Sequence, residues 1–326
     1  MAQNQPALSV VVPVYNGADT IEELVDAVSA LPVEGGLELV LVHDCGQDNS
    51  WEILKKLAAD AKTPITVINH ARNYGEHNTV MTGLRHARGQ YVITMDDDLQ
   101  NPPQELLKLY RHCRERDLDV VYAVYGKKEH ATWRNLGSKF ANLVADWISD
   151  KPRGLYLSTF RCMNRFLVDQ LIEHRGPFVY IDGLIFQVTR RAESVEVLHL
   201  PNRTGRSNYT LGRLVALWAT ILIGFSVKPL RISTAVGVGM FALGVLGALY
   251  IIIDQWLAGP TVSGWASLAC LILVFTGTQF LVLGLLGEYV GRAFLTLNGK
   301  PQSAVRDVLT SADAKPVKRP KPAASR

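Results

Sequence analysis

Three consecutive aspartates follow an apolar run in the first third of the chain. Asp96, Asp97 and Asp98 come directly after residues 91–95, a run typical of a buried β-strand. Open α/β sheets bind ligands at the carboxyl ends of their strands. Asp96 and Asp98, two residues apart, offer oxygen ligands to one Mg²⁺ or Mn²⁺ ion, and Gln100 adds a third. The string predicts a divalent metal site that holds a diphosphate; a solvated acidic turn is the alternative.

Two long uncharged runs near the C-terminus predict a membrane hairpin. Residues 232–253 and 265–287 contain no charged side chain, and each is long enough to cross a hydrocarbon core of roughly 30 Å as a helix. Lys and Arg flank the runs but are absent from residues 254–264. The positive-inside bias therefore predicts that both termini and the large N-terminal domain lie in the cytoplasm. The expected location is a bacterial-type inner (cytoplasmic) membrane. Residues 214–227 are too short to span, so an interfacial helix and a buried core helix remain equal alternatives.

The composition, the charge distribution and the cysteine spacing limit the functions that fit this chain. Hydrophobic residues make up 48% of 326, and the net charge is only +4. Much of the positive excess lies in residues 315–321, whose Pro and Lys content predicts disorder. No motif supports nucleic-acid binding. The four cysteines have no metal-ligand spacing, which favours reduced thiols.

The first 125 residues alternate strand and helix patterns, which predicts a mainly parallel sheet with helices on both faces. The expected strands are residues 8–15, 37–42, 65–69, 91–95 and 119–124, and the expected helices are 19–31, 48–59, 79–88 and 102–116. Asp19 and Glu22 predict a capping box at the first helix. Later residues suggest helices at 131–148, 164–174 and 182–191 and extended segments at 155–162 and 194–200.

Four regions follow from these patterns. The expected regions are a cytoplasmic catalytic domain at 1–209, an interfacial amphipathic region at 210–229, a two-helix transmembrane hairpin at 230–292 and a cytoplasmic, largely disordered basic tail at 293–326. The fold class is therefore a Rossmann-like α/β domain followed by an interfacial helix and two membrane helices.

Other polar residues also follow strands and are expected at the same crevice. Asp44 is suited to accept hydrogen bonds from a nucleobase or ribose, with a helix N-cap as the alternative. Residues 72–75 suit a phosphate held by backbone N–H groups, with a plain turn as the alternative. His77 is interpreted as a structural histidine rather than a metal ligand.

Together these motifs resemble the family 2 glycosyltransferases, which have the GT-A fold. The matching segments are Val11–Asn16, Asp44, Arg72–Gly75, Asp96–Pro103 and a later string from His199 to Tyr209. Their order, followed by two spans, is similar to the polyprenyl-phosphate glycosyltransferases. That group includes dolichol-phosphate mannose synthase and the undecaprenyl-phosphate aminoarabinose (formamido) transferases.

The resemblance implies roles for individual residues. The implied metal ligands, for Mg²⁺ or Mn²⁺, are Asp96, Asp98 and Gln100. The implied nucleotide-sugar contacts are Pro13, Tyr15, Asn16, Asp44, Asn73, Gly75, Asp96 and Asp97. The implied acceptor-phosphate residues are Arg134, Ser138 and Arg203, which with Asp98 form the catalytic set; Asn142 matches a further family position. The resemblance also implies a homo-oligomer.

Three departures from the family pattern affect the interpretation. His43-Asp44-Cys45-Gly46 replaces the usual Asp-Asp-Gly-Ser, and Tyr125 stands where some members have arginine. Thr159 stands where some members have an aspartate proposed as the base. A phosphate monoester has a second pKa near ~6 and is already an ionised nucleophile at neutral pH. The missing aspartate therefore favours a lipid-phosphate acceptor over a hydroxyl acceptor.

The sequence thus predicts a metal-dependent, inverting glycosyltransferase that moves a sugar from a nucleoside-diphosphate sugar to polyprenyl phosphate. A processive polysaccharide synthase is one alternative, but the chain has no Gln-x-x-Arg-Trp string. A catalytically silent nucleotide-sugar-binding scaffold is another, which the departures at His43 and Thr159 keep open.

Overall fold

The computed structural model describes residues 5–125, 155–200, 228–258 and 264–311. The chain divides into two compact units. One comprises residues 1–208 with 300–326, and the other comprises residues 209–299. The expected helix at 131–148, the string after His199 from residue 201 onward and the expected interfacial segment up to residue 227 lie outside the described residues.

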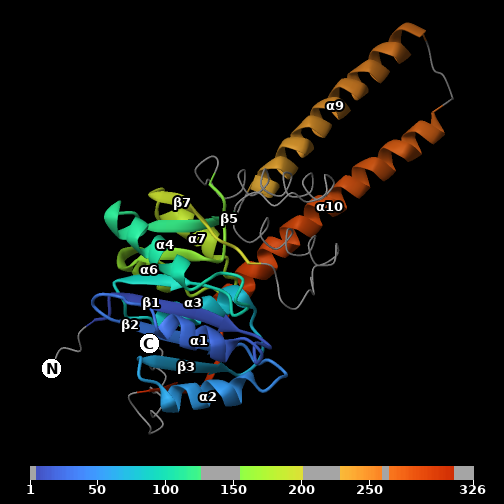
Figure 1. Cartoon of the computed structure of the whole chain (residues 1–326). Helices are drawn as coiled ribbons and strands as arrows, with labels where there is room; N and C mark the ends of the chain where they lie inside the picture. Colours follow the sequence, from blue (N-terminus) through green and yellow to red (C-terminus); the bar gives the residue numbers. More distant parts are fainter. Residues whose placement is uncertain (1–4, 126–154, 201–227, 259–263, 312–326) are drawn as a thin grey trace, which may run out of the picture. The chain divides into compact units, whose positions relative to one another are not determined.

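A single mixed sheet forms the centre of the first unit (Figure 1). Its eight strands lie in the order β7-β5-β6-β4-β1-β2-β3-β8. The strands are β1 (Leu8–Val14), β2 (Leu37–His43), β3 (Ile65–His70), β4 (Tyr91–Thr94), β5 (Val120–Tyr125), β6 (Arg161–Asn164), β7 (Ala192–Val197) and β8 (Val305–Thr310). The pairs β1–β2, β1–β4, β2–β3 and β5–β7 are parallel, whereas β6 and β8 run antiparallel to their neighbours. The mostly parallel mixed sheet agrees with the predicted α/β class.

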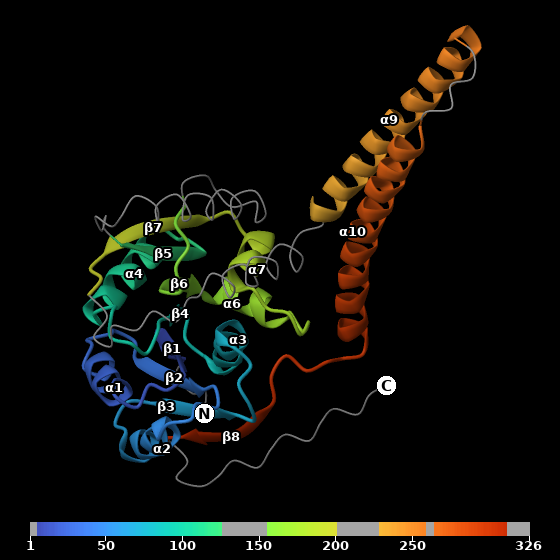
Figure 2. The same cartoon turned by 90° about the vertical axis from the view of Figure 1, so that its right-hand side faces the viewer.

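Helices cover both faces of this sheet. They are α1 (Ile21–Ser29), α2 (Ser50–Asp60), α3 (Glu76–His86), α4 (Gln104–Glu115), α6 (Arg165–Ile172) and α7 (Ile181–Val188). Figure 2 shows α3, α6 and α7 on one face and α1, α2 and α4 on the other. Because both faces are covered, the central strands read as continuous apolar runs rather than alternating ones. All seven residues of β2 are buried.

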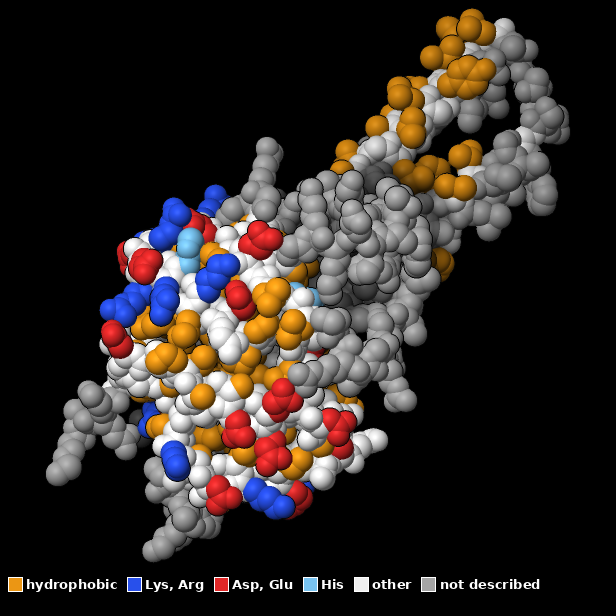
Figure 3. All heavy atoms as spheres, viewed as in Figure 1, with side chains coloured by type: hydrophobic (Ala, Val, Ile, Leu, Met, Phe, Trp, Pro, Cys, Tyr) orange, Lys and Arg blue, Asp and Glu red, His pale blue; other side chains and the backbone are white. Residues whose placement is uncertain are grey.

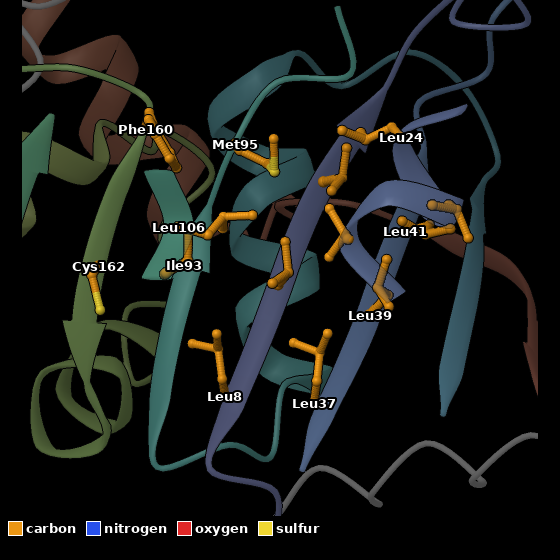
Figure 4. Close-up of a cluster of buried hydrophobic side chains, with 14 of the residues drawn as sticks. Leu8, Leu24, Leu37, Leu39, Leu41, Ile93, Met95, Leu106, Phe160 and Cys162 are labelled. Carbon is orange, nitrogen blue, oxygen red and sulfur yellow. The ribbon is translucent and has the colours of Figure 1, made fainter. Parts of the chain in front are cut away.

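The main hydrophobic core lies between the sheet and the helices α1, α2 and α4. Figure 4 shows Leu8, Leu39 and Ile93 from three neighbouring strands in one cluster with Leu24 of α1 and Leu106 of α4. All five side chains are fully buried. Burying side chains of this size stabilises the fold by about 1.5–3 kcal/mol each, and it fixes the strand ends where the polar loops begin.

The predicted capping box at α1 is wrong. The helix begins at Ile21 with Thr20 as its N-cap, and no side chain caps it. Thr20 Oγ1 instead donates a hydrogen bond of 3.2 Å to the carbonyl of Gly17. The turn that precedes the helix therefore uses the hydroxyl, and Asp19 lies one residue too early to cap the helix. Helix α3 likewise begins at Glu76, three residues before its predicted start.

The prediction of a largely disordered tail at 293–326 is wrong for residues 305–310. These residues form β8, which pairs antiparallel with β3. Without β8, the outer edge of β3 would expose a row of unpaired backbone N–H and C=O groups. Backbone pairing, rather than a long apolar run, specifies this strand, because its first three residues are exposed. Figure 2 shows β8 beside β3.

The second unit contains two long helices, α9 (Lys228–Ala258) and α10 (Trp265–Leu297). Hydrophobic side chains lie along their described surface (Figure 3). Within the described residues, Val274–Leu297 is long and apolar enough to cross a membrane, with a mean hydropathy of 1.5. The apolar stretch found in α9, Ser233–Gly247, is shorter. The predicted helical hairpin is present, and a second complete span remains a prediction.

Helix α3 packs against the sheet through a glycine, which gives a stability test. A Cβ on Gly83 would lie 2.3 Å from Cγ1 of Val11, a buried strand side chain. Replacing a helical glycine by alanine normally stabilises by about 0.5–1 kcal/mol, but overpacking costs about 1–3 kcal/mol. We expect Gly83→Ala to lower the unfolding temperature of the detergent-solubilised protein. Gly247→Ala, where a Cβ meets open space, is the control; equal or raised unfolding temperatures for both variants would contradict this packing.

Candidate active site

The loops that follow β1, β2, β3 and β4 meet at one edge of the sheet. The backbone N–H of Tyr15 donates to Asp97 Oδ2 at 3.3 Å, which joins the first loop to the acidic string. Asn16 Oδ1 accepts a hydrogen bond of 2.7 Å from the N–H of Gln47, in the loop after β2. The carboxylate of Asp44 accepts from the backbone of residues 74 and 75, after β3. The structure therefore connects the loops that contain Tyr15, Asn16, Asp44, Gly75 and Asp97, and the nucleotide-sugar contacts themselves stay predictions.

The backbone of these loops is held in an unfavourable conformation. Asn16, Cys45 and Leu99 have φ values of 55°, 55° and 57°, and they are three of the four non-glycine residues with positive φ in the described chain. Gly75 has φ 85°. The Cβ atom disfavours this region in every residue except glycine, and non-glycine residues in it cluster at functional sites. The non-glycine residues with positive φ therefore lie at the same strand ends as the polar residues of the predicted site.

The three aspartates point to different partners. Asp96 Oδ2 accepts a hydrogen bond of 2.8 Å from Thr159 Oγ1, and Asp98 Oδ1 accepts one of 3.0 Å from the N–H of Gln100. Burial, together with the charge of Asp98, raises the pKa of Asp96. Burial and the neighbouring carboxylates Asp96 and Asp98 raise the pKa of Asp97 to about 7. The string thus holds negative charge that protein groups neutralise incompletely.

The donor set fits a hard divalent cation. Asp96 Oδ1 has no hydrogen-bond donor among the described residues, and all three aspartates are partly exposed. No group of three or more His, Cys, Asp or Glu side chains converges in the part of the chain that the structure describes. The predicted set of Asp96, Asp98 and the amide Gln100 does not require such a group and stays a prediction. When bound, Mg²⁺ or Mn²⁺ supplies positive charge that stabilises a departing diphosphate.

Asp44 holds the loop after β3. It is buried, its Oδ1 accepts from the N–H of Tyr74 and its Oδ2 from the N–H of Gly75, both at 2.8 Å. The prediction that this loop presents its backbone N–H groups to a phosphate is therefore wrong for these two residues. The N-cap alternative for Asp44 is also wrong for the next helix, since Asn49 occupies that position in α2. A contact between Asp44 and a nucleoside stays a prediction.

A buried network beneath the acidic string was not predicted. Arg161 is 1% exposed and forms a charged hydrogen bond to Asp182. Its Nε donates to Thr94 Oγ1 at 3.3 Å, and Thr94 Oγ1 donates to the carbonyl of Thr159 at 2.6 Å. Burial alone lowers the pKa of Arg161, but Asp182 and Tyr122 raise it, so the guanidinium stays charged. Arg161 therefore helps to fix Thr159, the residue whose hydroxyl donates to Asp96. In the sequence, the only indication of this role is that Arg161 lies two residues after Thr159.

The predicted acceptor-phosphate residues lie outside the described residues. These are Arg134, Ser138 and Arg203, together with Asn142. Their proposed roles stay predictions. His77 is described: its ring lies edge-on to Tyr180 at 5.3 Å between centroids, and burial lowers its pKa to about 4. The ring of His77 is thus neutral and partly buried, and its structural interpretation stays a prediction.

Residues 9–180 match the family described as glycosyl transferase family 2. The chain belongs to glycosyl transferase family 2. Residues 228–293 of this family-2 glycosyltransferase also match the GtrB C-terminal hairpin. The family match covers the part of the first unit that contains the strand-end site and its acidic string. The hairpin match covers most of the second unit and agrees with membrane association through that unit.

Full-length relatives of this glycosyltransferase have named activities. The chain is 33% identical over 317 residues to the undecaprenyl-phosphate 4-deoxy-4-formamido-L-arabinose transferase of Pseudomonas fluorescens, covering 95% of this chain and 92% of the relative. It is 31% identical over 315 residues to the transferase of the same name from Yersinia pestis, covering 95% and 96%. Among solved structures, Mycobacterium tuberculosis glucosyl-3-phosphoglycerate synthase is 18% identical, with a TM-score of 0.49 over 67% of this chain and 78% of that one.

Glu76, the first residue of α3, adds a further carboxylate beside the acidic string. Its side chain is exposed to solvent, although surrounding protein atoms partly desolvate the carboxyl group. This desolvation and the charge of Asp96 raise its pKa from an ordinary 4.5 to about 7. Protonation of Glu76 therefore stabilises the folded state, and this contribution is lost as the pH rises from about 4.5 to about 7.

We expect Glu76→Gln to reduce the fall in unfolding temperature between pH 5 and pH 8, because glutamine cannot ionise. The measurement is thermal unfolding of the solubilised protein in EDTA at both pH values. Glu22→Gln, at an exposed position of α1, should retain the parent profile. Identical profiles for Glu76→Gln and the parent would rule out this titration.

Proposed function

We propose that this enzyme transfers one sugar from a nucleoside-diphosphate sugar to undecaprenyl phosphate, with inversion, at the cytoplasmic face of the membrane. The observation that carries the proposal is the 33% identity to the Pseudomonas fluorescens transferase, which extends over 95% of this chain and therefore includes the hairpin. The strand-end site with its acidic string supplies the donor half of the reaction. The hairpin keeps the enzyme at the membrane that contains the acceptor.

The chemistry of Thr159 supports a phosphate acceptor. Its hydroxyl donates its hydrogen to Asp96 Oδ2, so this position orients the acidic string and does not remove a proton. A sugar or polyprenol hydroxyl would need a general base. A phosphate monoester is ionised at neutral pH and attacks the anomeric carbon without one. A phosphate acceptor thus brings its own nucleophilic charge and does not require Thr159 to generate one.

In this proposal, the residues of the nucleotide-sugar site and of the acceptor site have separate roles. Asp96, Asp98 and Gln100 hold the divalent cation, and Asp97 lies beside the nucleotide. The nucleoside side of the site comprises Pro13, Tyr15, Asn16, Asp44, Asn73 and Gly75. By family resemblance, the acceptor phosphate is held by Arg134, Ser138 and Arg203. Tyr15 is 51% exposed at the end of β1, which leaves its ring accessible to a ligand.

Asp98→Asn should abolish transfer and weaken donor binding together, since it removes one negative ligand of the cation. We expect a loss of about 100-fold or more, because outer partners of metal ligands alone are worth about 10–100-fold. The assay follows radiolabelled sugar into undecaprenyl phosphate with Mg²⁺ or Mn²⁺. Asp60→Asn, exposed at the end of α2, is the charge-matched control. Full activity in Asp98→Asn, or wild-type turnover in excess chelator, would eliminate the metal proposal.

The same assay identifies the donor and separates the rivals. A panel of nucleotide sugars, including the nucleoside-diphosphate form of 4-deoxy-4-formamido-L-arabinose, is offered with undecaprenyl phosphate. A single added sugar by mass spectrometry supports the proposal, and a polymer supports a processive synthase. Absence of metal-dependent nucleoside-diphosphate release with every donor would favour a catalytically silent scaffold.

Arg134→Ala should raise the KM for undecaprenyl phosphate and change the donor KM little. Loss of a guanidinium paired with a desolvated phosphate costs on the order of 2–5 kcal/mol. Free undecaprenol should not be glycosylated, because Thr159 cannot act as a base. Arg111→Ala, at an exposed position of α4, is the control. Efficient glycosylation of undecaprenol, or an unchanged acceptor KM in Arg134→Ala, would refute the acceptor assignment.

A further inference from the structure

The segment that follows the membrane hairpin reaches the donor site. Residues 302–311, here called the C-terminal segment, are held along β3 by the β8 pairing and by a 2.9 Å hydrogen bond from the N–H of Ala71 to the carbonyl of Ala304. The buried Gln302 adds a 2.8 Å hydrogen bond from Nε2 to the carbonyl of Gly176. Because β8 runs antiparallel, its first residues lie at the carboxyl end of β3, where the site loops begin.

One chain of side chains runs from this segment to the loop after β3. Ser303 Oγ lies 2.9 Å from Thr82 Oγ1, which lies 3.0 Å from Nε2 of the fully buried His70. His70 Nδ1 donates to Asp44 Oδ1 at 2.9 Å. Asp44 in turn accepts from the backbone of residues 74 and 75. Ser303 is thus connected, through three side chains, to the backbone at the start of α3.

A second chain runs to the loop after β2. Asn69 Nδ2 donates to Asp307 Oδ2 at 3.3 Å, and Asn69 Oδ1 accepts from His43 Nδ1 at 2.9 Å. His43 Nε2 accepts a 3.1 Å hydrogen bond from the N–H of Gly46. This pattern requires a hydrogen on Nδ1 and none on Nε2, so the acceptor in Asn69 and the donor in Gly46 select one tautomer. His43, which departs from the family pattern, therefore has a partner in the C-terminal segment.

We infer that Ser303 and Asp307 are positioning residues of the donor site, each holding one of its loops through a separate hydrogen-bond chain. The inference rests on the proposed function in one respect, that these loops bind the nucleotide sugar. Cys45, in the loop after β2, has a φ of 55°, which is unfavourable for a residue with a Cβ atom. Such a conformation persists only when its surroundings hold it. The C-terminal segment supports this loop through His43 and supports the loop after β3 through Asp44.

The strand also provides a matched control. Ser311 Oγ accepts a 3.0 Å hydrogen bond from the N–H of Ile65, at the opposite end of β3. Ser303→Ala and Ser311→Ala each remove one serine hydroxyl from the same segment. The first lies on the chain to Asp44, and the second lies at the end of the sheet remote from the loops. A general weakening of β8 would affect the two variants alike.

Hydrogen–deuterium exchange of the full-length protein tests the coupling without any donor. We expect Ser303→Ala to accelerate exchange in peptides covering residues 71–78 and Asp307→Ala to accelerate it in peptides covering 43–50. Ser311→Ala should leave both regions at the wild-type rate. Ser303→Thr and Asp307→Asn, which keep an oxygen at each position, should restore protection. Equal loop exchange in Ser303→Ala, Asp307→Ala and Ser311→Ala would overturn the inference.

Binding and kinetics test the functional part. UDP, GDP and dTDP are titrated with Mg²⁺, and the donor KM is measured with the nucleotide sugar that the wild type accepts. Loss of one hydrogen bond predicts a roughly 3- to 10-fold rise in the donor KM or nucleotide Kd for Ser303→Ala, with the acceptor KM unchanged. An unchanged donor KM and Kd would reduce Ser303 to a structural residue. If no donor supports transfer, the proposed function fails, while exchange and nucleotide binding still decide this inference.

Discussion

Three adjacent carboxylates at the end of β4 repel one another, and the site is arranged to keep each of them in place. Asp97 receives the N–H of Tyr15, Asp98 receives the N–H of Gln100, and Asp96 receives the hydroxyl of Thr159. These bonds do not remove the cost of ionising all three groups, because burial and the charges of the neighbouring carboxylates still raise the pKa of Asp96 and Asp97. The string therefore retains negative charge of the kind that a divalent cation would offset, as the proposed function requires.

The two antiparallel strands explain how distant parts of the chain reach this edge. Parallel strands deliver their carboxyl ends to the site, whereas β6 and β8 begin there. The start of β6 brings Thr159 and Arg161 beneath the acidic string, and the start of β8 brings Ser303 beside the network of Asp44. A purely parallel sheet would leave those positions to loops alone. The mixed topology therefore supports the site from both sides of the four central strands.

The sequence predicted the elements whose signals are local. The buried strands β1 to β5 are apolar runs followed by polar residues, so both their position and the location of the site could be inferred. Strand β8 was missed because its pairing depends on β3, which lies far away in the sequence. The predicted phosphate-binding backbone of Tyr74 and Gly75 failed for the same reason, since the distant Asp44 accepts both hydrogen bonds. The ion pair of Arg161 with Asp182 likewise has no local pattern.

Thr159 connects the electrostatics of the donor with the choice of acceptor. An aspartate there would add a fourth negative charge beside Asp96, where desolvation already disfavours ionisation. Threonine instead gives its hydrogen to Asp96, which keeps that carboxylate available to a cation but leaves no base at this position. The hydroxyl stabilises the acidic string, and an acceptor that is already ionised needs no base at position 159. A lipid phosphate is such an acceptor, and the hairpin that follows the domain provides access to the membrane where lipid phosphates are found.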